Sequence, residues 1–581
     1  MTGGPRDGLD APRRHLLLTV LGTSTNASIY SLRGREREAE LAPLALVHLL
    51  PAAMRPDKVL ALCTREAKLR TFPLLKRSLG SACDLDFVEV PTGDSQDDIG
   101  IFLEKVTDAI PEGTDLTVDV THGFRHFAFL TFSAVLYLCE LHGVRVRGAY
   151  YGLFRETGPS PFLDLRPLLE LPRWIHALQV LRETGSALPM ARIVSRDASS
   201  GNAARDIARD LSGLSESYLA GLPLEAGRYA SDVKIRNRSM RKLLGDRLPL
   251  ARDLTKRLVR TLEPLALQPA GGQGWKQKVV LSRDELNRQA KMIDELLRRK
   301  NYAVAFGLLN EWTVSWISLV RGKEDVWLDY HQSRRAAAGV LGAMAAVAKD
   351  PELGEALTED QIKLAEYWDK LSVLRNAYAH HGMRAQVLVG EKDVDRTRNE
   401  VKEYWRHLKL LPDVSLSLGH SPGKRVLVSP MGKRPGVLFS AVHAACAGHA
   451  RSASLCLVIC SSETEGTIAP TLRRADYAGD WNPLVLEDAF AGGARQIDHV
   501  AKEGKQHLLG AEEVIVNVTG GTTLMGLAAD RLASEARQLA CPVVRRFGLI
   551  DRRSPREQET DPYQVGEPFW LDERGEDAER D

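Results

Sequence analysis

Two short patterns occur twice in this chain, in the same order and near its two ends. The segment Leu18–Thr23 aligns with Val428–Lys433, and Asp119–Gly123 aligns with Asn517–Gly521. In each copy an apolar run ends in a glycine turn, and a later apolar run ends in a Thr-x-Gly sequence ahead of a helical pattern. A sequence that repeats itself in this way indicates duplicated structural units. We therefore predict one α/β fold that occurs twice, separated by a stretch of another kind.

The first copy alternates predicted strands with predicted helices. Strands fit the apolar runs His15–Leu21, Lys58–Leu62, Leu85–Val90, Leu116–Val120 and Val144–Tyr151. Helices fit the segments Leu41–Leu50, Glu66–Ser78, Asp97–Ile110 and Phe127–Leu141. This alternation indicates a Rossmann-like parallel sheet with helices on both faces, and such sheets bind ligands beyond the carboxyl ends of their strands. No G-x-G-x-x-G sequence follows the first strand, which argues against a dinucleotide-dependent dehydrogenase.

Two polar turns fall at that edge of the predicted sheet, Gly22–Asn26 and Thr121–Arg125. One interpretation is structural, because glycine supplies backbone freedom and threonine caps a helix. The other is ligand binding, because backbone N–H groups at helix N-termini suit phosphates. The two interpretations are compatible. The second copy repeats the pattern with predicted strands at Arg425–Ser429, Ser454–Cys460, Pro483–Leu486, Glu513–Val518 and Val543–Leu549.

The stretch between the copies is helical. A charged segment runs from Leu171 to about Lys278, and Ala270–Gly274 is its clearest linker. Its basic cluster, Arg236–Lys242, fits a solvated helix face better than part of an RNA path. An all-α module follows, with helices predicted at Ser282–Arg299, Tyr302–Val320, Arg334–Ala348, Glu359–Ala379 and Val394–Leu411. Capping boxes are predicted at Ser282 with Glu285 and at Thr358 with Gln361, and the tryptophans Trp312, Trp316 and Trp368 are predicted to be core residues.

The end of the fourth helix in this module carries the strongest candidate for chemistry. Leu364, Trp368, Leu371 and Tyr378 form one apolar stripe, and Arg375 and His380 lie off it. A guanidinium grips phosphate through its planar fork, and an imidazole moves a proton near neutral pH. An arginine and a histidine this close on a helix also occur by chance.

The sequence Arg375-Asn376-x-x-x-His380 resembles the motif of HEPN ribonucleases. The first α/β unit resembles the CRISPR-associated Rossmann-fold (CARF) domain, through the residues Leu21-Gly22-Thr23, Asp119–Arg125 and Tyr150-Tyr151-Gly152. The last unit resembles a second CARF domain, through Ser429–Gly432 and Asn517–Met525. We therefore expect four parts: an N-terminal CARF domain at 1–170, a helical connector at 171–280, a HEPN domain at 281–415 and a C-terminal CARF-like domain at 423–581.

The resemblance implies an accessory ribonuclease of type III CRISPR antiviral defence. In that family a CARF domain, usually in a homodimer, binds cyclic oligoadenylate, and paired HEPN domains then cut single-stranded RNA. We expect cyclic tetra-adenylate as the activator by family analogy. The implied chemistry is attack by the ribose 2′-OH, leaving a 2′,3′-cyclic phosphate and a 5′-OH. His380 would move the proton, Arg375 would stabilise the phosphoryl charge and Asn376 would orient its neighbours, with His381 as the rival of His380.

Ligand-binding residues are expected at the polar turns of both CARF-like units. In the first unit they are Gly22, Thr23, Ser24, Thr25, Thr121, His122, Gly123, Phe124 and Arg125, and in the second Gly432, Lys433, Asn517, Thr519, Gly520, Gly521, Thr522 and Thr523. Many CARF domains carry a lysine where Thr523 stands here. The second unit therefore has three open roles: it binds the ring differently, degrades it as a ring nuclease, or serves structure and dimerisation. Two alternatives remain: a non-catalytic sensor that recruits a partner, and a self-limiting protein in which either CARF domain also degrades the activator.

Composition sets the remaining expectations. Charge is nearly balanced, with 78 Lys+Arg against 76 Asp+Glu, so an RNA grip must be local. Seven cysteines without C-x-x-C spacing favour a reducing cytosol, with Cys456 and Cys460 as buried thiols. No signal sequence or membrane-spanning run is expected, and we expect a cytoplasmic protein with no metal, no cofactor and no stable protein partner.

Overall fold

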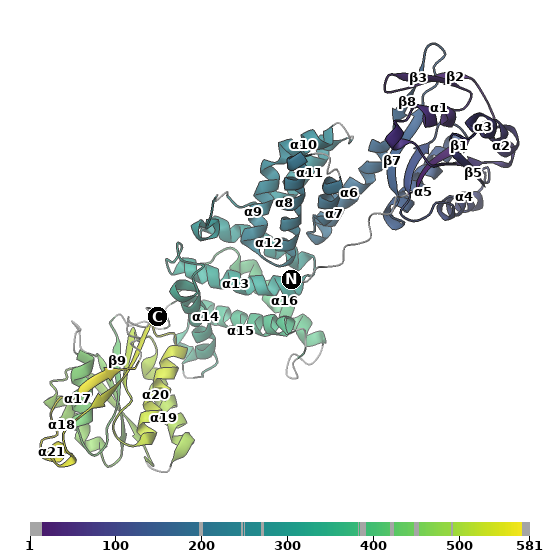
Figure 1. Cartoon of the computed structure of the whole chain (residues 1–581). Helices are drawn as coiled ribbons and strands as arrows, with labels where there is room; N and C mark the ends of the chain where they lie inside the picture. Colours follow the sequence, from purple (N-terminus) through teal and green to yellow (C-terminus); the bar gives the residue numbers. More distant parts are fainter. Residues whose placement is uncertain are drawn as a thin grey trace. The chain divides into compact units, whose positions relative to one another are not determined.

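The computed structural model describes residues 14–571 except 197–200, 246–247, 249, 269–271, 352, 381–382, 384–390, 417, 419–422, 447–452 and 490–491. It is a mixed α/β structure with two mainly parallel sheets and many helices (Figure 1). The chain forms two compact units. The first comprises residues 1–218 and 229–263, and the second comprises residues 219–228 and 264–581.

The sheet of the first unit is built around strand β1 (His15–Leu21), which is buried along its whole length. Parallel neighbours β4 (Lys58–Cys63) and β6 (Asp115–Asp119) flank β1, and β5 (Asp84–Glu89) and β7 (Arg145–Gly152) lie outside them. All five strands agree with the sequence prediction to within a residue or two at their ends. The carboxyl ends of β1 and β6, and the polar turns after them, therefore meet at one edge of the sheet.

Helices cover both faces of this sheet. Leu17 and Leu21 of β1 pack toward α1 (Ala42–Leu49) and α3 (Phe72–Leu79). The alternate residues Leu16, Leu18 and Val20 belong to a second core with α4 (Gln96–Asp108) and α5 (Arg125–Leu141). Two cores on opposite faces are the reason why the strand reads as a continuous apolar run. The helix predicted at Glu66–Ser78 is broken at Thr71 into α2 (Arg65–Arg70) and α3.

The sequence prediction missed three strands of the first unit. They are β2 (Ser28–Leu32), β3 (Arg35–Ala39) and β8 (Ser160–Asp164). Strand β8 runs antiparallel to β7 and parallel to β2, and β2 and β3 form an antiparallel hairpin. The expectation of a purely parallel sheet is therefore wrong at this edge. Each of these strands has only five residues and includes polar residues or a proline, so none has the longer apolar run that identified the others.

After the first sheet, the described residues form six α-helices. They are α6 (Arg166–Thr184), α7 (Leu188–Arg196), α8 (Gly201–Leu219), α9 (Pro223–Ile235), α10 (Asn237–Gly245) and α11 (Ala251–Leu262). Helix α6 begins five residues before the expected boundary at Leu171, because Pro167 occupies its first turn, where proline is tolerated. Of the predicted linker, Ala270 and Gly271 lie outside the described residues.

The all-α module contains α12 (Arg283–Arg298), α13 (Tyr302–Val320), α14 (Arg335–Ala348), α15 (Glu359–Ala379) and α16 (Glu391–Leu408), as predicted. The capping box of α15 is present in full. At α12 only half is present, because Ser282 accepts the Glu285 amide while the Glu285 carboxylate pairs with Arg288 instead. Trp312 and Trp316 are core residues, whereas Trp368 is only half-buried.

Helix α13 corrects the expectation that no apolar run is long enough to span a membrane. By length and composition it passes that test, alone among the helices of the described residues. Within this structure 61% of its most apolar window is buried, as in the central helix of a globular domain. Its Trp312 packs edge-to-face against Trp405 of α16, with ring centroids 4.8 Å apart.

Within the described residues, the strands of the second sheet follow the order of six strands of the first. It runs β11-β10-β9-β12-β13-β14, where the first sheet contains β5-β4-β1-β6-β7-β8. The strands are β9 (Arg425–Pro430), β10 (Leu455–Ser461), β11 (Asp480–Leu486), β12 (Glu513–Asn517), β13 (Val543–Ile550) and β14 (Glu567–Trp570). In both sheets the first five are parallel and the last, β8 or β14, is antiparallel to its neighbour. The duplication predicted from the sequence is thus a duplication of topology.

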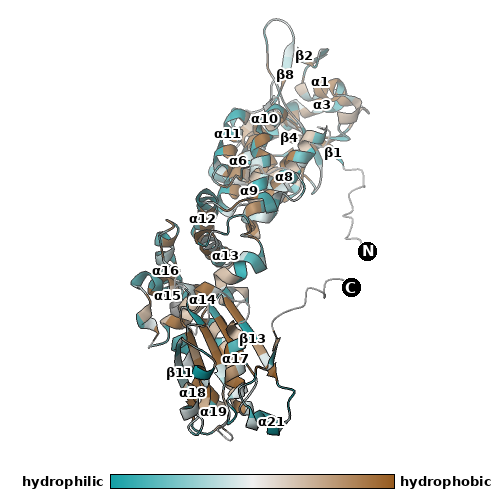
Figure 2. Cartoon of the chain, turned by 90° about the vertical axis from the view of Figure 1, so that its left-hand side faces the viewer, coloured by the Kyte–Doolittle hydropathy of each residue, from teal (hydrophilic) through white to brown (hydrophobic). Residues whose placement is uncertain are grey.

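Helices again cover both faces of the second sheet. Figure 1 shows α17 (Gly436–Cys446) and α18 (Ile468–Arg474) on one side, and α19 (Gly493–Leu508) and α20 (Thr523–Gln538) on the other. A short helix, α21 (Pro555–Thr560), precedes the antiparallel strand β14. The strands between the helix layers are largely apolar (Figure 2). Cys456 and Cys460 are buried thiols, as predicted.

Candidate functional site

The edge of the first sheet is organised by a buried carboxylate at the end of β6. Asp119 accepts hydrogen bonds from the Thr19 hydroxyl at 2.8 Å and from the Thr121 amide at 3.1 Å, and also from the Thr121 hydroxyl. The Thr121 hydroxyl oxygen in turn accepts the Gly152 amide at 2.8 Å. Burial raises the pKa of Asp119. The network ties the ends of three neighbouring strands, β1, β6 and β7, together.

The two glycine turns of this edge touch. A Cβ atom placed on Gly22 would lie 3.0 Å from the amide nitrogen of Gly123, and Gly123 itself has φ +92°. A side chain at either position would push the turns apart or strain the backbone. The glycines therefore hold the predicted turns Gly22–Asn26 and Thr121–Arg125 side by side.

His122 faces inward rather than toward a ligand. Its Nε2 accepts the backbone N–H of Ala42, the first residue of α1, at 3.0 Å. Burial lowers the pKa of His122, and an accepting Nε2 requires the neutral ring. His122 thus anchors the start of α1, a role that the sequence did not indicate.

The other predicted residues of this edge are open to solvent. Thr23, Ser24 and Thr25 are exposed, and so are Phe124 and Arg125. Arg125 is the first residue of α5 and has no carboxylate partner among the described residues. A cation is unfavourable at a helix N-terminus. Its position at this edge is therefore suited to an anionic ligand rather than to the helix.

The second sheet repeats the same network with an amide in place of the carboxylate. Asn517 accepts the Thr519 amide at 3.0 Å and the Thr519 hydroxyl at 2.9 Å, and it donates to the Ser429 hydroxyl at 3.1 Å. The Thr519 hydroxyl oxygen accepts the Leu549 amide at 2.8 Å, as Thr121 accepts Gly152. A Cβ atom on Gly432 would lie 2.8 Å from the Cα of Gly521, so these turns also touch.

The second edge differs from the first in its charges. Lys433 is 80% exposed and forms an ion pair with Glu463 at 3.5 Å. Thr522 caps α20 and donates to the Ala489 carbonyl at 2.7 Å, and Thr523, which takes the place of Arg125, is exposed. The remaining predicted residue, Gly520, has φ +104° and packs on Val437. This edge therefore presents less unpaired positive charge than the first.

The candidate catalytic residues lie at the end of α15. Arg375 is exposed, and its Nη1 donates to the side-chain oxygen of Asn376 at 3.0 Å. His380 caps the helix, with its backbone N–H on the Asn376 carbonyl at 3.0 Å, and its ring is exposed. Asn376 therefore contacts both candidates. His381 lies outside the described residues.

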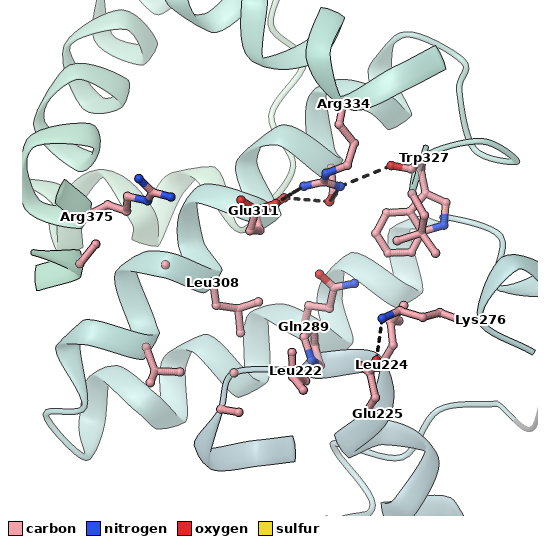
Figure 3. A pocket seen from close by; sticks show the side chains of 18 of the residues that line it. Leu222, Leu224, Glu225, Lys276, Gln289, Leu308, Glu311, Trp327, Arg334 and Arg375 are labelled. Carbon is pink, nitrogen blue, oxygen red and sulfur yellow. Dashed lines mark hydrogen bonds and ion pairs between the residues drawn. The ribbon is translucent and has the colours of Figure 1, made fainter. Parts of the chain in front are cut away.

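A cavity of about 970 Å³ lies beside this helix end, entirely within the second compact unit. It is lined by residues 220–225, by parts of α12 and α13, by residues 327–329 and by the last turns of α15. Figure 3 shows Arg375 directed toward it from α15, on the side opposite Trp327 and Lys276. The cavity is large enough for a nucleotide-sized ligand.

Of the cations that line this cavity, Arg375 alone among the described residues lacks a carboxylate partner. Arg334 pairs with Glu311 at 2.5 Å and also donates to the Trp327 carbonyl (Figure 3). Lys276 pairs with Glu225 at 2.6 Å. The Arg375 guanidinium is therefore the one cation here that can bind an incoming phosphate without breaking an ion pair.

Several residues around the helix end were not foreseen. Tyr378 packs on Tyr302 and Phe306 of α13, and Arg398 and Lys402 of α16 lie over the Tyr302 ring at 4.4 and 4.5 Å. The sequence did not indicate that Arg334 lines this cavity, because its partner Glu311 lies on α13, far from it in the chain. No cluster of three or more potential metal ligands occurs within the described ranges.

Comparisons with known proteins give two similarities. The chain is 22% identical over 121 residues to the CRISPR-associated protein MJ1674 of Methanocaldococcus jannaschii, a match that covers 20% of this chain and only 19% of that protein. Among solved structures it resembles Enterococcus italicus Csm6 bound to cyclic hexa-2′-fluoro-hexa-dAMP, with 12% identity, a TM-score of 0.34, and coverage of 68% of this chain and 94% of that chain. No family model matches the sequence.

Proposed function

We propose that this protein is a CARF–HEPN ribonuclease of type III CRISPR defence. In this proposal cyclic oligoadenylate, with cyclic tetra-adenylate first among the candidates, binds the edge of the first sheet, and the module around α15 cuts single-stranded RNA. Sequence similarity to a CRISPR-associated protein over 121 residues supports the setting. The duplicated sheets with their shared hydrogen-bond network support the sensor part.

The observation that carries the nuclease part is the state of Arg375. It lines the cavity beside α15 with its guanidinium free of any carboxylate among the described residues, and Asn376 holds it in place. His380 follows at the helix end with an exposed ring. A phosphodiester bound by Arg375 would lie near an imidazole that can exchange a proton with solvent.

The chemistry follows from these groups. The ribose 2′-OH attacks the adjacent phosphorus and the bond to the 5′-oxygen breaks, which leaves a 2′,3′-cyclic phosphate and a 5′-OH. Arg375 stabilises the charge on the phosphoryl oxygens, and His380 moves the proton. Because the motif occurs once per chain, we propose that two copies act together as a homodimer. This reaction calls for no cofactor.

The test is an RNA-cleavage assay with a panel of ring sizes and mapped product ends. We expect Arg375→Ala and His380→Ala each to lower the rate by at least about 100-fold, because Arg375 binds the phosphate and stabilises its charge in the transition state, and His380 moves the proton. Binding of the ring should stay unchanged, since the first sheet belongs to the other compact unit.

Lys363→Ala is the matched control. Lys363 lies on the same helix and pairs only with Glu359 at the surface, so its loss should leave cleavage intact. Full cleavage by the Arg375→Ala protein would contradict the assignment of the site. Ring binding without cleavage by the unaltered protein would instead favour a sensor that recruits a partner.

A further inference from the structure

A basic site lies between α10 and α11 in the helical part of the first compact unit. A cleft of about 250 Å³ is lined by Asn237, Arg241, Arg252, Thr255, Lys256, Val259 and Arg260. Four of these residues are cations, all exposed, and none of the lining residues is acidic. No ion pair is formed by any of the four within the described part of the chain. The cleft is thus a concentration of unpaired positive charge.

The spacing of the cations on α11 indicates a role outside the helix. Arg252, Lys256 and Arg260 follow one another at intervals of four residues, so they lie in one row along the helix. Like charges at this spacing destabilise a helix. The nearby acid Asp253 does not relieve the row, because it pairs with Arg257 at 2.7 Å. A row of cations that destabilises its own helix is consistent with a surface that binds a chain of phosphates.

A row of cations favours a chain of phosphates over a single anion, because successive cations can each contact a separate phosphate.

We propose that this cleft is an exosite that binds the backbone of single-stranded RNA through Arg241, Arg252, Lys256 and Arg260. The inference rests on the proposed function in taking single-stranded RNA as the substrate. It gives the helices α10 and α11 a role in binding the strand. The row of cations on α11 is about 12 Å long at 1.5 Å per residue, enough for more than one phosphate.

The experiment measures binding of a labelled single-stranded RNA to the full chain at several salt concentrations. The background variant is His380→Ala, so that the strand stays uncut. We expect Arg252→Ala/Lys256→Ala to weaken binding and to lower the slope of log affinity against log salt by about 1.4, because each lost phosphate contact accounts for about 0.7 on a single strand. An unchanged slope would overturn the proposal.

The matched control is Lys76→Ala/Arg77→Ala on α3, which also removes two exposed cations from the first unit. We expect this control to leave the salt slope unchanged. If both variants lowered the slope equally, the effect would come from net charge alone and the proposal would be overturned. Thermal unfolding adds a check on folding. The α11 variant should be at least as stable as the parent, because the substitution relieves like-charge repulsion.

Two further arms separate the possible ligands. In the first arm ATP replaces RNA. If Arg252→Ala/Lys256→Ala abolished ATP binding but left RNA binding intact, the cleft would be a free-nucleotide site and the proposal would be overturned. A DNA strand of the same sequence replaces RNA in the second. We expect Arg252→Ala/Lys256→Ala to lower the salt slope for RNA and for DNA alike, because these cations contact phosphates. A loss confined to DNA would overturn the proposal. Binding is measured without cleavage, so a failure of the nuclease proposal leaves this result readable by itself.

Discussion

Asp119 and Asn517 occupy equivalent positions and show what this position requires. In each, one side-chain oxygen accepts both the amide and the hydroxyl of the threonine two residues later. The second side-chain atom reverses its role, since Asp119 accepts from Thr19 whereas Asn517 donates to Ser429. The position therefore needs one acceptor oxygen that fixes the threonine turn, and either an acid or an amide supplies it.

His122 leads to a prediction about pH. Its folded pKa lies below the ordinary value of 6.5, so the unfolded chain takes up a proton before the folded domain does. The stability it contributes is complete above about pH 6.5 and is lost as pH falls through that value toward the folded pKa. We expect the start of α1 to lose protection from hydrogen exchange on acidification from about pH 8 to pH 5.

The measurement compares the parent with His122→Gln, whose side chain has an acceptor that does not titrate in this range. Helix α17 serves as an internal control, because it lies between β9 and β10 as α1 lies between β1 and β4, and Gly520 stands in the second unit where His122 stands in the first. Equal pH dependence of α1 in parent and variant would show that another group is responsible.

At the scale of elements, the contact between glycine turns defines each sheet edge. In the first unit Gly22, after β1, lies against the turn that follows β6, and in the second unit Gly432, after β9, lies against the turn that follows β12. The hydrogen-bond network then ties the adjacent strands together. Neither turn would hold its conformation alone, since each contributes the surface against which the other packs.

Alanine substitution at these glycines tests the contact. We expect Gly22→Ala and Gly432→Ala to lower the free energy of unfolding of their units by about 1–3 kcal/mol, as overpacked sites do. Gly100→Ala on α4 is the matched control, because its Cβ would meet nothing within 4 Å. It should raise stability by about 0.5–1 kcal/mol. Denaturant titration of the three proteins measures the difference, and a neutral Gly22→Ala would show that the turns can separate freely.

At the scale of the whole molecule, the duplication raises the question of which sheet would bind the cyclic oligoadenylate of the proposed function. The first edge carries Arg125 without a carboxylate partner among the described residues, whereas the second carries Lys433, already paired with Glu463. Thr523 supplies no charge at the position equivalent to Arg125. The charges therefore favour the first unit as the sensor and leave the second a structural or a weaker binding role.

A binding experiment distinguishes the two sheets. We expect Arg125→Ala to raise the Kd for cyclic tetra-adenylate by about 10- to 100-fold, the effect of one charge-assisted hydrogen bond. Lys433→Ala should change it by less than about 3-fold, because an exposed and paired lysine contributes little. Isothermal titration calorimetry on both variants measures this, and the reverse order of effects would assign ring binding to the second sheet.

The sequence by itself determined the repeated α/β pattern, the buried parallel strands and the helices of the central module. These features depend on periodicity and on caps between near neighbours, such as Thr358 with Gln361. Only the tertiary structure decided the short strands β2, β3, β8 and β14. It also decided the hydrogen bond of His122 with the start of α1 and the pairing of Arg334 with Glu311. It also left Arg375 without a carboxylate partner among the described residues. The physical reason is that burial and ion pairing join groups far apart in the chain, and a local pattern carries no record of such partners.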